Sequence, residues 1–244
     1  MQGKVALITG GGTGIGRAVA LRLAQEGTHI AINYSRSERE ALTVQSEVKA
    51  LGCKAKAFRA DVADDAAVRL MIAAVIQEFG HLDILVNNAG MTHFVEHADL
   101  DGLKDEYWDD MIDVNVKGLF HCCRAAAPEL KKQRGCIVNI TSIAGMTGLG
   151  SSIAYAASKA AAISVTKSLA RVLAPEVRVN AVAPGIVQTR WVAGQDEHIK
   201  RLAEGTPLGG VAAPEDVAEV VFSLIANARF VTGQNIVVDG GMFI

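Results

Sequence analysis

The stretch "TGGGTGIG", residues 9–16, joins a short apolar run, "KVALIT" (4–9), to a helix-like segment, "GRAVALRLAQEG" (16–27). Its alternating glycines leave the backbone bare at a strand-to-helix turn. Bare N–H groups beside a helix N-terminus favour the close approach of a pyrophosphate. A glycine-rich stretch alone is weak support, but this position between strand and helix predicts a dinucleotide-binding turn. The candidate cofactor contacts in it are Gly10, Gly12, Thr13, Gly14, Ile15 and Gly16.

Strand-like and helix-like runs alternate along the rest of the chain. The strand-like runs are nearly continuous in Val, Ile, Leu and Ala, which is typical of parallel strands covered on both faces. Strands separated by helices predict right-handed crossovers, and therefore an α/β fold with a doubly wound parallel sheet. No repeat or linker interrupts the pattern, so residues 1–244 are expected to form one domain. The remaining strand-like runs are 29–34, 55–62, 82–90, 136–142, 177–185 and 235–241.

A polar, glycine-punctuated segment breaks this alternation at about residues 190–210. It lies between a strand-like run and the last helix-like run. Segments in such positions often close over a site, so we expect a substrate cover here. The alternative is an ordinary surface loop.

Charge and composition disfavour several classes of protein. The 244 residues carry a formal net charge of −2, so no basic field favours nucleic acid or an anionic membrane. No apolar run reaches the ~18–20 residues that cross a bilayer, and the N-terminus lacks the features of a signal peptide. The four cysteines and six histidines show no metal-ligand spacing, so we expect buried, reduced thiols and no metal site. The expected location is the cytoplasm.

The end of the second strand-like run bears on the choice of nucleotide. A site for NAD usually places Asp or Glu about 20 residues after the glycines, to accept a hydrogen bond from the ribose 2′-hydroxyl. This chain instead has Tyr34, Ser35 and Arg36, and its next carboxylate is Glu38. A hydroxyl and a guanidinium suit a 2′-phosphate, which Arg can bind through two hydrogen bonds. We therefore expect NADP(H) rather than NAD(H). The alternative is that Arg36 is an ordinary exposed cation.

Two further strand ends carry candidate cofactor contacts. Asp61 and Val62 follow the third run, where Asp61 either lies near an adenine ring or caps the next helix. "NNAG", residues 87–90, ends the fourth run. Asparagines in a buried strand need partners, which suggests a structural role for Asn87 and a cofactor-facing role for Asn88. The candidate contacts at these two ends are Asp61, Val62, Asn88, Ala89 and Gly90.

The stretch "YAASK" places Tyr155 and Lys159 four residues apart, on one face of a helix predicted over residues 154–174. Alone, such a pair is common and can be a solvated surface feature. Two polar residues add weight: Ser142 ends the fifth strand-like run, and Asn115 lies in another helix-like run. Each also has a structural alternative. Ser142 could only terminate a strand, and Asn115 could be a buried amide that bends a helix.

Together, these motifs resemble the short-chain dehydrogenase/reductase family over essentially all 244 residues. The resemblance rests on TGGGTGIG (9–16), Asp61-Val62, NNAG (87–90), Asn115, Ser142, Tyr155-x-x-x-Lys159, Pro184-Gly185 and Thr189, in the family's order and approximate spacing. It implies a Rossmann-like sheet of seven parallel strands in the order 3-2-1-4-5-6-7, with helices on both faces, and a homotetramer. It also implies hydride transfer between NADP(H) and a carbonyl or alcohol group.

The resemblance implies a role for each matching residue. Tyr155 would be the general acid/base, with its pKa lowered from about 10 by the cation of Lys159 and by a positive nicotinamide. Lys159 would also hold the nicotinamide ribose, and Ser142 would donate a hydrogen bond to the carbonyl oxygen. Asn115 would fix a water that links Lys159 to solvent. The remaining implied cofactor contacts are Pro184, Gly185, Val187 and Thr189, although Pro184-Gly185 could be only a turn.

The substrate is less well defined by the sequence. The chain length and the closing "VTGQNIVVDGGM" resemble the 3-oxoacyl-acyl-carrier-protein reductases, with glucose dehydrogenases and broad-specificity alcohol dehydrogenases or ketoreductases as alternatives. Most candidate pocket residues are small or apolar, which favours a neutral ketone or an acyl thioester. Trp191 could equally be an interface anchor. The candidates, besides Ser142 and Tyr155, are His93, Phe94, Gly145, Met146, Trp191 and Val192.

The surface differs from that of the carrier-protein reductases at two places. Those proteins commonly show arginines where this chain has Gln133 and Pro175-Glu176. A basic docking patch for an acyl carrier protein remains an alternative, because other cations lie nearby in sequence. They are Lys131, Lys132, Arg134 and Arg178.

Two other activities are disfavoured by the Tyr155–Lys159 pair. Enoyl reductases space these two residue types more widely, so reduction of a carbon–carbon double bond is not expected. A regulator that binds NADP(H) without chemistry should have lost the Tyr or the Lys, and both are present.

Overall fold

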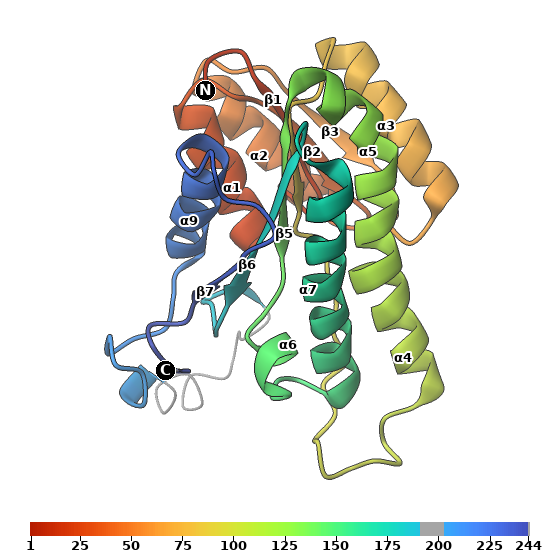
Figure 1. Ribbon diagram of the computed structural model, residues 1–244, viewed down its shortest axis with the longest axis vertical. Coiled ribbons are helices and arrows are strands. Elements are labelled where there is room, and N and C mark those ends of the chain that lie inside the picture. The colour runs from red at the N-terminus through yellow and green to blue at the C-terminus, as the bar shows by residue number, and fades with distance from the viewer. Residues whose placement is uncertain (191–202, 244) are drawn as a thin grey trace.

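A computed structural model describes residues 1–190 and 203–243 of the chain. Its centre is a seven-stranded sheet in the order β3-β2-β1-β4-β5-β6-β7, in which every pair of neighbours is parallel (Figure 1). The strands are β1 (Val5–Ile8), β2 (His29–Tyr34), β3 (Ala55–Arg59), β4 (Ile84–Asn87), β5 (Cys136–Ile140), β6 (Arg178–Pro184) and β7 (Asn235–Val238). The predicted strand order and doubly wound class are confirmed.

Helices connect these strands. The longer ones are α1 (Gly14–Gln25), α2 (Glu38–Ala50), α3 (Asp65–Phe79), α4 (Asp105–Ile112), α5 (Leu119–Gln133), α7 (Ile153–Leu173) and α9 (Pro214–Ala226). A short helix, α6 (Ala144–Thr147), follows β5, and a π-helix, η1 (Asp113–Gly118), joins α4 to α5. Within the described residues, no helix has the length and apolarity that a bilayer crossing needs.

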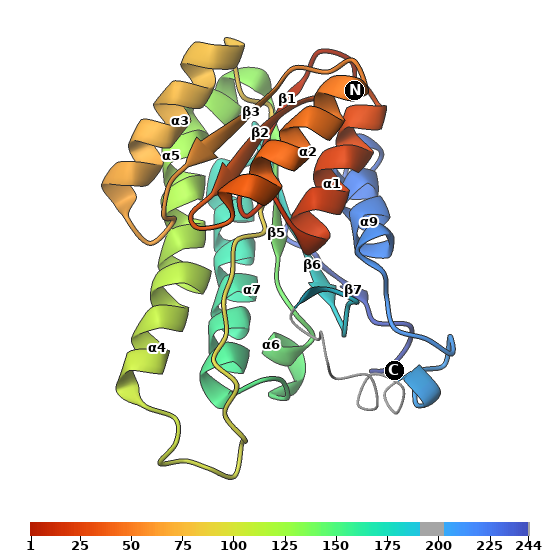
Figure 2. The ribbon, with the colours of Figure 1, turned by 180° about the vertical axis from the view of Figure 1, so that it is seen from behind.

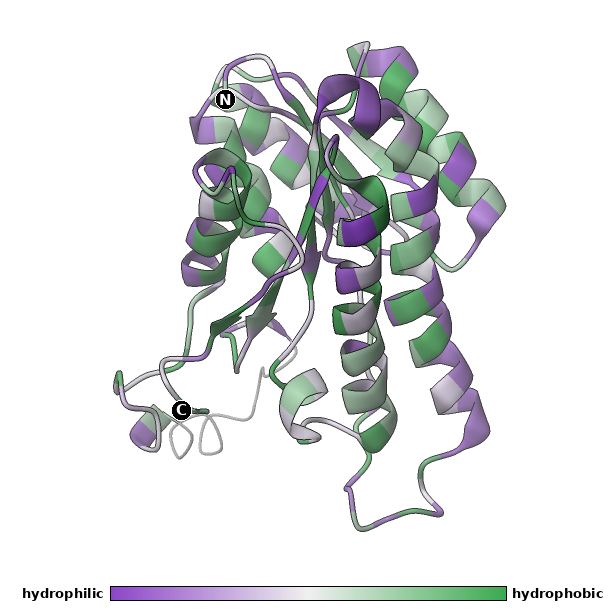
Figure 3. Cartoon of the chain, viewed as in Figure 1, coloured by the Kyte–Doolittle hydropathy of each residue, from purple (hydrophilic) through white to green (hydrophobic). Residues whose placement is uncertain are grey.

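The helices form a layer on each face of the sheet (Figures 1 and 2). Side chains alternate across a strand, so in β1 Ala6 and Ile8 face one layer while Val5 and Leu7 face the other. The first layer contains α1, α2 and α9, and the second contains α3, α5 and α7. Full burial of an aliphatic side chain stabilises a fold by about 1.5–3 kcal/mol, so this two-sided core holds the strand ends in place. Figure 3 shows green and purple residues side by side on the outer helices, as expected for helices buried along one stripe.

Helix α3 shows how local sequence sets an element's ends. The carboxylate of Asp64 accepts hydrogen bonds from the N–H groups of Ala66 and Ala67, at 2.9 and 3.1 Å. At the other end, Gly80 adopts a left-handed φ of 88°, which glycine does without strain. The alternative that Asp61 caps this helix is therefore wrong, because Asp64 does so.

The order of the strands creates a switch point beside β1. From β1 the chain builds outward through β2 and β3, then returns to place β4 on the other side of β1. In open α/β sheets ligands bind at the carboxyl ends of the strands at such a point. The lower end of the molecule in Figure 1 carries α6 and the segment that follows β4. Part of the expected cover, residues 191–202 with Trp191 and Val192, lies outside the described residues.

Candidate active site

The glycine turn after β1 is packed too tightly for side chains. A Cβ on Gly16 would lie 2.4 Å from the carbonyl oxygen of Gly10 and 2.5 Å from Nδ2 of Asn88. Gly12 is similarly close to the backbone of α2, with a Cβ 2.9 Å from the N of Ala41. Gly10 and Gly14 also have positive φ angles, of 60° and 51°. The turn therefore keeps bare backbone at the N-terminus of α1, which is the cradle that a pyrophosphate fits.

Two buried side chains hold this turn in place. Thr9 is 1% exposed, and its Oγ1 accepts hydrogen bonds from the N–H groups of Asn88 and Ala89, at 3.0 and 2.9 Å. In return, Nδ2 of Asn88 donates to the carbonyl oxygens of Thr9 and Gly10, at 3.0 and 3.1 Å. These four hydrogen bonds help to join the ends of β1 and β4. The amide nitrogen of Asn88 therefore braces the glycine turn.

Asn33 is a functional candidate that the sequence reasoning missed. It is 2% exposed in β2, and its Oδ1 accepts a hydrogen bond from the N–H of Gly10 at 3.3 Å. Its Nδ2 donates to the carbonyl oxygen of Ala60 at 3.0 Å, so one amide joins three strand ends. The signal was present, because an asparagine interrupts the apolar run "HIAINY" and needs buried partners.

The predicted 2′-phosphate contacts follow β2 directly. Ser35 and Arg36 are exposed, and the hydroxyl of Tyr34 donates to Oε1 of Glu38 at 2.8 Å. This hydrogen bond raises the pKa of the Tyr34 phenol. The Tyr34 hydroxyl thus already has a partner, whereas Ser35 and Arg36 extend from the surface at the carboxyl end of the sheet.

The other candidates lie at the carboxyl ends of β3 and β4. Asp61 is exposed, and its Oδ1 accepts from the N–H of Ala63 at 3.0 Å. Val62 is 5% exposed and packs where a Cβ on Gly118 would be 2.7 Å from its Cγ2. Asn87 has the structural position expected of it: its Nδ2 donates to Oδ1 of Asn139 at 2.9 Å.

The segment after β6 returns to the glycine turn. Pro184 is buried, and its carbonyl oxygen accepts from the N–H of Ile143 at 3.1 Å. Thr189 lies beside Gly14, because a Cβ on Gly14 would be 3.2 Å from its Cγ2. The remaining candidates of this segment are the half-buried Gly185 and the buried Val187. The structure therefore places Thr189, near the end of the motif series, beside the glycines that begin it.

Tyr155, Lys159 and Ser142 come together between α7 and the end of β5. Nζ of Lys159 lies 5.7 Å from the centroid of the Tyr155 ring. The same ammonium donates to the carbonyl oxygen of Ile140, the last residue of β5, at 2.9 Å. Ser142, two residues further, is hydrogen-bonded to the Tyr155 side chain. Oγ of Ser142 also accepts a hydrogen bond from the N–H of Ala144 at 3.1 Å. Ser142 can therefore terminate the strand and also contact Tyr155.

Burial sets the protonation of this pair. Lys159 is 5% exposed, and burial lowers the pKa of its ammonium from 10.5 to about 8. Burial raises the pKa of Tyr155 to about 12, while its hydrogen bond with Ser142 acts in the opposite direction. The sequence argument expected a lowered Tyr155 pKa. Without a bound cofactor, desolvation has the largest effect on the Tyr155 pKa and raises it. The sequence argument also included the positive charge of the nicotinamide, and that charge would be needed to lower the Tyr155 pKa.

Asn115 lies in η1 and is 3% exposed. Its Oδ1 accepts from the N–H of Met91 at 2.9 Å, and its Nδ2 donates to the Met91 carbonyl oxygen at 3.0 Å and to Oγ of Ser158 at 3.0 Å. A Cβ on Gly90 would lie 3.3 Å from Oδ1 of Asn115 and 3.6 Å from Nζ of Lys159. Asn115 and Lys159 therefore border the same small space beside Gly90. Asn115 also fits the structural alternative, because it is a buried amide in the irregular helix η1.

The candidate substrate residues separate into different environments. Phe94 and Met146 are 63% and 56% exposed. His93 is directed to α4: its Nε2 lies 2.9 Å from Oδ2 of Asp110, and its ring stacks on Tyr107 with centroids 4.1 Å apart. Gly145 is a contact between helices rather than a pocket wall, because a Cβ there would be 2.5 Å from the N of Ala160 in α7. This close contact holds the segment after Ser142 against the helix that carries Tyr155.

Two of the four proposed docking cations, Arg178 and Lys132, have partners within the protein. The guanidinium of Arg178 donates to the carbonyl oxygens of Leu224, Ile225 and Ala228, at 2.8, 3.0 and 3.1 Å, and so caps the end of α9. On α5, the carboxylate of Glu129 accepts from Lys132 at 2.9 Å and from Gln133 at 3.0 Å. Three of the five N–H donors of Arg178 are therefore used inside the protein, whereas Lys131 and Arg134 are exposed.

Comparisons with known proteins agree with this arrangement. Residues 10–243 match a family model described as Enoyl-(Acyl carrier protein) reductase. The chain is 43% identical over 244 residues to the 3-oxoacyl-acyl-carrier-protein reductase FabG of Staphylococcus aureus, covering 98% of both proteins. It is 41% identical over 249 residues to the protein of the same name from Thermotoga maritima, covering 100% of this chain and 99% of that protein. A short-chain dehydrogenase from Burkholderia cenocepacia, solved in complex with NADP, superposes with a TM-score of 0.92 at 38% identity, covering 100% and 99%.

Proposed function

Because the chain belongs to the short-chain dehydrogenase/reductase family, we propose that it uses NADPH to reduce the carbonyl group of a neutral, apolar ketone or 3-oxoacyl thioester. The family and these relatives make it an oxidoreductase that acts on carbonyl or alcohol groups. The observation that carries the finer proposal is the meeting of Tyr155, Lys159 and Ser142 between α7 and the end of β5. The product would be a secondary alcohol.

The bare glycine turn is the observation that fits a bound dinucleotide. Its packing excludes a Cβ at Gly16 and leaves N–H groups at the start of α1 for the pyrophosphate. Lys159 and the turn after Pro184 would hold the nicotinamide end, with Thr189 beside its carboxamide. When bound, NADPH supplies the hydride that reduces the carbonyl carbon.

The chain's own residues would manage the charge on the carbonyl oxygen. Oγ of Ser142 would donate a hydrogen bond to that oxygen as its negative charge develops. Tyr155 would give the oxygen its proton, and the phenolate left behind is stabilised by the nearby ammonium of Lys159. Asn115, which lies with Lys159 beside Gly90, would fix a water through which a proton passes between Lys159 and solvent. In the reverse direction the same groups would accept the alcohol proton.

The preference for NADP(H) over NAD(H) rests on the residues after β2. Arg36 and Ser35 are exposed there and no carboxylate occupies either position, while the Glu38 carboxylate accepts the Tyr34 hydroxyl. A guanidinium can bind a phosphate through two hydrogen bonds, whereas NAD sites use a carboxylate at this point. The name of the Burkholderia relative, a complex with NADP, supports the same assignment.

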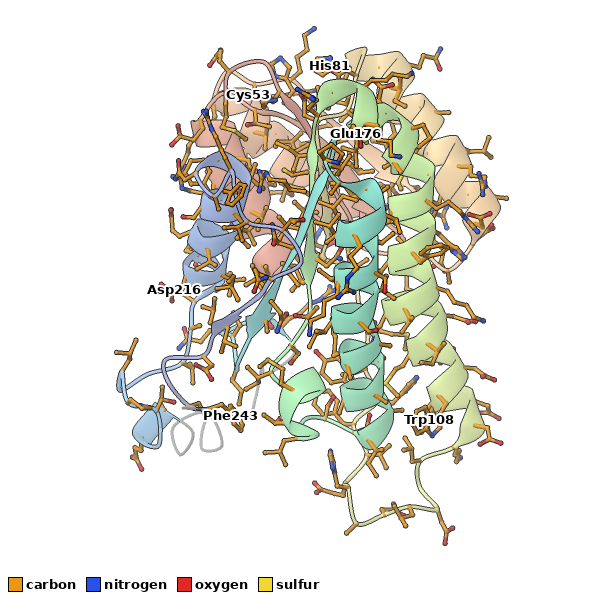
Figure 4. The ribbon with its side chains drawn as sticks, in the orientation of Figure 1. Cys53, His81, Trp108, Glu176, Asp216 and Phe243 are labelled. Carbon is orange, nitrogen blue, oxygen red and sulfur yellow. The ribbon has the colours of Figure 1, made fainter. Side chains whose placement is uncertain are left out.

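The apolar character of the substrate rests on side chains around the carboxyl end of the sheet. Exposed apolar side chains come from four segments there: the one after β4, α6 with the residues after it, the one before α9, and the C-terminus. They are Phe94, Met146, Leu149, Leu208 and Phe243. Figure 4 labels Phe243 at this lower end, with His81 and Cys53 at the opposite end. Exposed apolar side chains at the carboxyl end of the sheet favour an apolar ligand.

The names of the relatives support a 3-oxoacyl thioester, but the surface favours a small molecule over a carrier protein. A carrier protein is acidic, and this chain has Gln133 and Pro175-Glu176 where the carrier-protein reductases commonly show arginines, while Arg178 is bonded within the protein. A ketone or a thioester of a small thiol is therefore the candidate best supported by the surface. A broad-specificity ketoreductase is the second candidate function, for the same reason.

We also propose a homotetramer in the cytoplasm, on the family resemblance. Light scattering after size-exclusion chromatography tests the assembly: a mass of four chains is expected, and a monomer would contradict it.

A substrate screen followed by NADPH absorbance tests the proposed function. Acetoacetyl thioesters of a small thiol and of an acyl carrier protein, diketones, cyclic ketones and steroids would be compared, with glucose and simple alcohols tested against NADP⁺. An enoyl thioester is the matched control for double-bond reduction. Oxidation of NADPH by an apolar ketone or small thioester, and none by the enoyl thioester, is expected. Turnover of the enoyl thioester alone would contradict the proposal.

A further inference from the structure

Ser158 joins two helices at the candidate active site. Its side chain is fully buried in α7, one residue before Lys159. Its Oγ accepts a hydrogen bond from Nδ2 of Asn115 in η1 at 3.0 Å. The same hydroxyl donates to the backbone carbonyl oxygen of Tyr155 at 2.8 Å. One hydroxyl therefore connects Asn115 to the helical turn that carries Tyr155 and Lys159.

The connection extends to the segment after β4. Asn115 uses its Oδ1 and its second Nδ2 hydrogen on the backbone of Met91, which follows Gly90. Because both amide donors of Asn115 have buried acceptors, the amide can neither rotate nor shift without losing a hydrogen bond. Ser158 is the member of this network that lies on α7. Without its hydroxyl, nothing polar in the network would bind that helix to Asn115.

A second arrangement of the same kind lies further along α7. Thr166 is 1% exposed, its Oγ1 accepts from Nδ2 of Asn139 at 2.8 Å, and it donates to the carbonyl oxygen of Ala162 at 2.8 Å. Asn139 is in β5 and binds Asn87 in β4. The two hydroxyls thus make the same kinds of hydrogen bond, but Thr166 lies about three helical turns beyond Tyr155. Thr166 is a matched control for a purely structural role.

We propose that Ser158 is a positioning residue, which fixes the Tyr155–Lys159 turn relative to Asn115 and Ser142. The proposal rests on the proposed function, in which Tyr155 is the proton donor. Ser158 touches neither substrate nor cofactor in this account. It acts by holding the phenol within reach of the Ser142 hydroxyl and the Lys159 ammonium. Chemistry should therefore depend on Ser158 more than cofactor binding does.

The first test compares Ser158→Ala with Thr166→Ala. Loss of one buried hydrogen bond that sets geometry should lower kcat by about tenfold in Ser158→Ala, with the Kd for NADPH within about twofold of wild type. Thr166→Ala should keep kcat while lowering the melting temperature. Ser158→Thr, which keeps the hydroxyl, should recover most of the loss. Equal kcat losses in the two alanine variants, or no loss in Ser158→Ala, would overturn the proposal.

A second readout does not need a substrate. The ionisation of Tyr155 can be followed by tyrosinate absorbance with NADP⁺ bound, after subtracting the signal of Tyr155→Phe. Lys159 on α7 and Ser142 after β5 both face this phenol. The Ser142 hydrogen bond lowers the Tyr155 pKa, so loosening it in Ser158→Ala should raise that pKa, and Thr166→Ala should not. If wild type reduces no carbonyl compound, the proposed function fails, yet this titration still decides the role of Ser158. An unchanged pKa in Ser158→Ala would overturn it.

Discussion

The glycine turn at residues 9–16 and the helical turn at residues 155–159 serve one candidate site through different physics. The glycine turn depends on absent atoms: a Cβ on Gly16 would lie 2.4 Å from a carbonyl oxygen. The second turn depends on charge in a buried place, where the pKa of Lys159 falls to about 8 and that of Tyr155 rises to about 12. The need for glycine in the first turn can be inferred from the residue types alone. The pKa shifts in the second turn depend on burial, which only the folded structure shows.

The largest effect should come from filling the glycine turn. Gly16→Ala places a methyl group against the Gly10 carbonyl and the Asn88 amide, which must move apart. We expect NADPH binding to weaken by about hundredfold or more, the equivalent of ~3 kcal/mol. Fluorescence titration of NADPH would measure it. Gly210→Ala is the control, because nothing lies within 4 Å of the added Cβ and the backbone there has no positive φ. Equal binding by the Gly16 variant and wild type would show that the turn is not the cradle.

A smaller effect should come from reversing the charge after β2. Arg36→Glu puts a carboxylate where the 2′-phosphate is expected, so the KM for NADPH should rise by about ten- to hundredfold. The KM for NADH should stay the same or fall. Arg39→Glu, an exposed cation on the neighbouring helix α2, is the matched control and should change the NADPH value far less. If both variants behave alike, Arg36 is an ordinary surface cation.

The buried ammonium should be visible in stability against pH. The pKa of Lys159 is lowered in the folded protein, from 10.5 to about 8, so between these values the unfolded chain binds more protons. The contribution of Lys159 to the unfolding free energy of wild type should therefore rise by about 1.4 kcal/mol per pH unit between about pH 8 and pH 10.5.

Lys159→Met isolates this contribution in denaturant titrations at several pH values. The variant should be more stable than wild type near pH 7, and the difference should shrink as pH rises from about 8 to 10.5. Parallel stability curves would mean that the ammonium keeps an ordinary pKa in the fold, and the contrast between the two turns would then be lost.

The sequence predicted the fold well because its signals are local. Continuous apolar runs predicted the buried parallel strands, and glycines after the first run predicted the turn that begins α1. The positions of Tyr155 and Lys159 on one helical face followed from their spacing of four residues. The strand order was implied by the family resemblance and is confirmed by the pairing of β1 with both β2 and β4.

The parts that the sequence could not give depend on partners far along the chain. Asn33 and Ser158 were missed because their hydrogen-bond partners, Gly10 and Asn115, are distant in sequence. Arg178 was named only as a cation near a possible docking patch, because nothing local indicates that it also caps α9. The raised pKa of Tyr155 was missed because desolvation requires the packed structure.

Removal of one oxygen atom tests the central claim most directly. Tyr155→Phe keeps the ring and its packing but removes the phenol that would give the carbonyl its proton. Turnover of the best substrate from the screen should fall by at least about thousandfold, with NADPH affinity and melting temperature close to those of wild type. A variant that binds NADPH normally and still reduces the carbonyl at a rate near that of wild type would contradict the account.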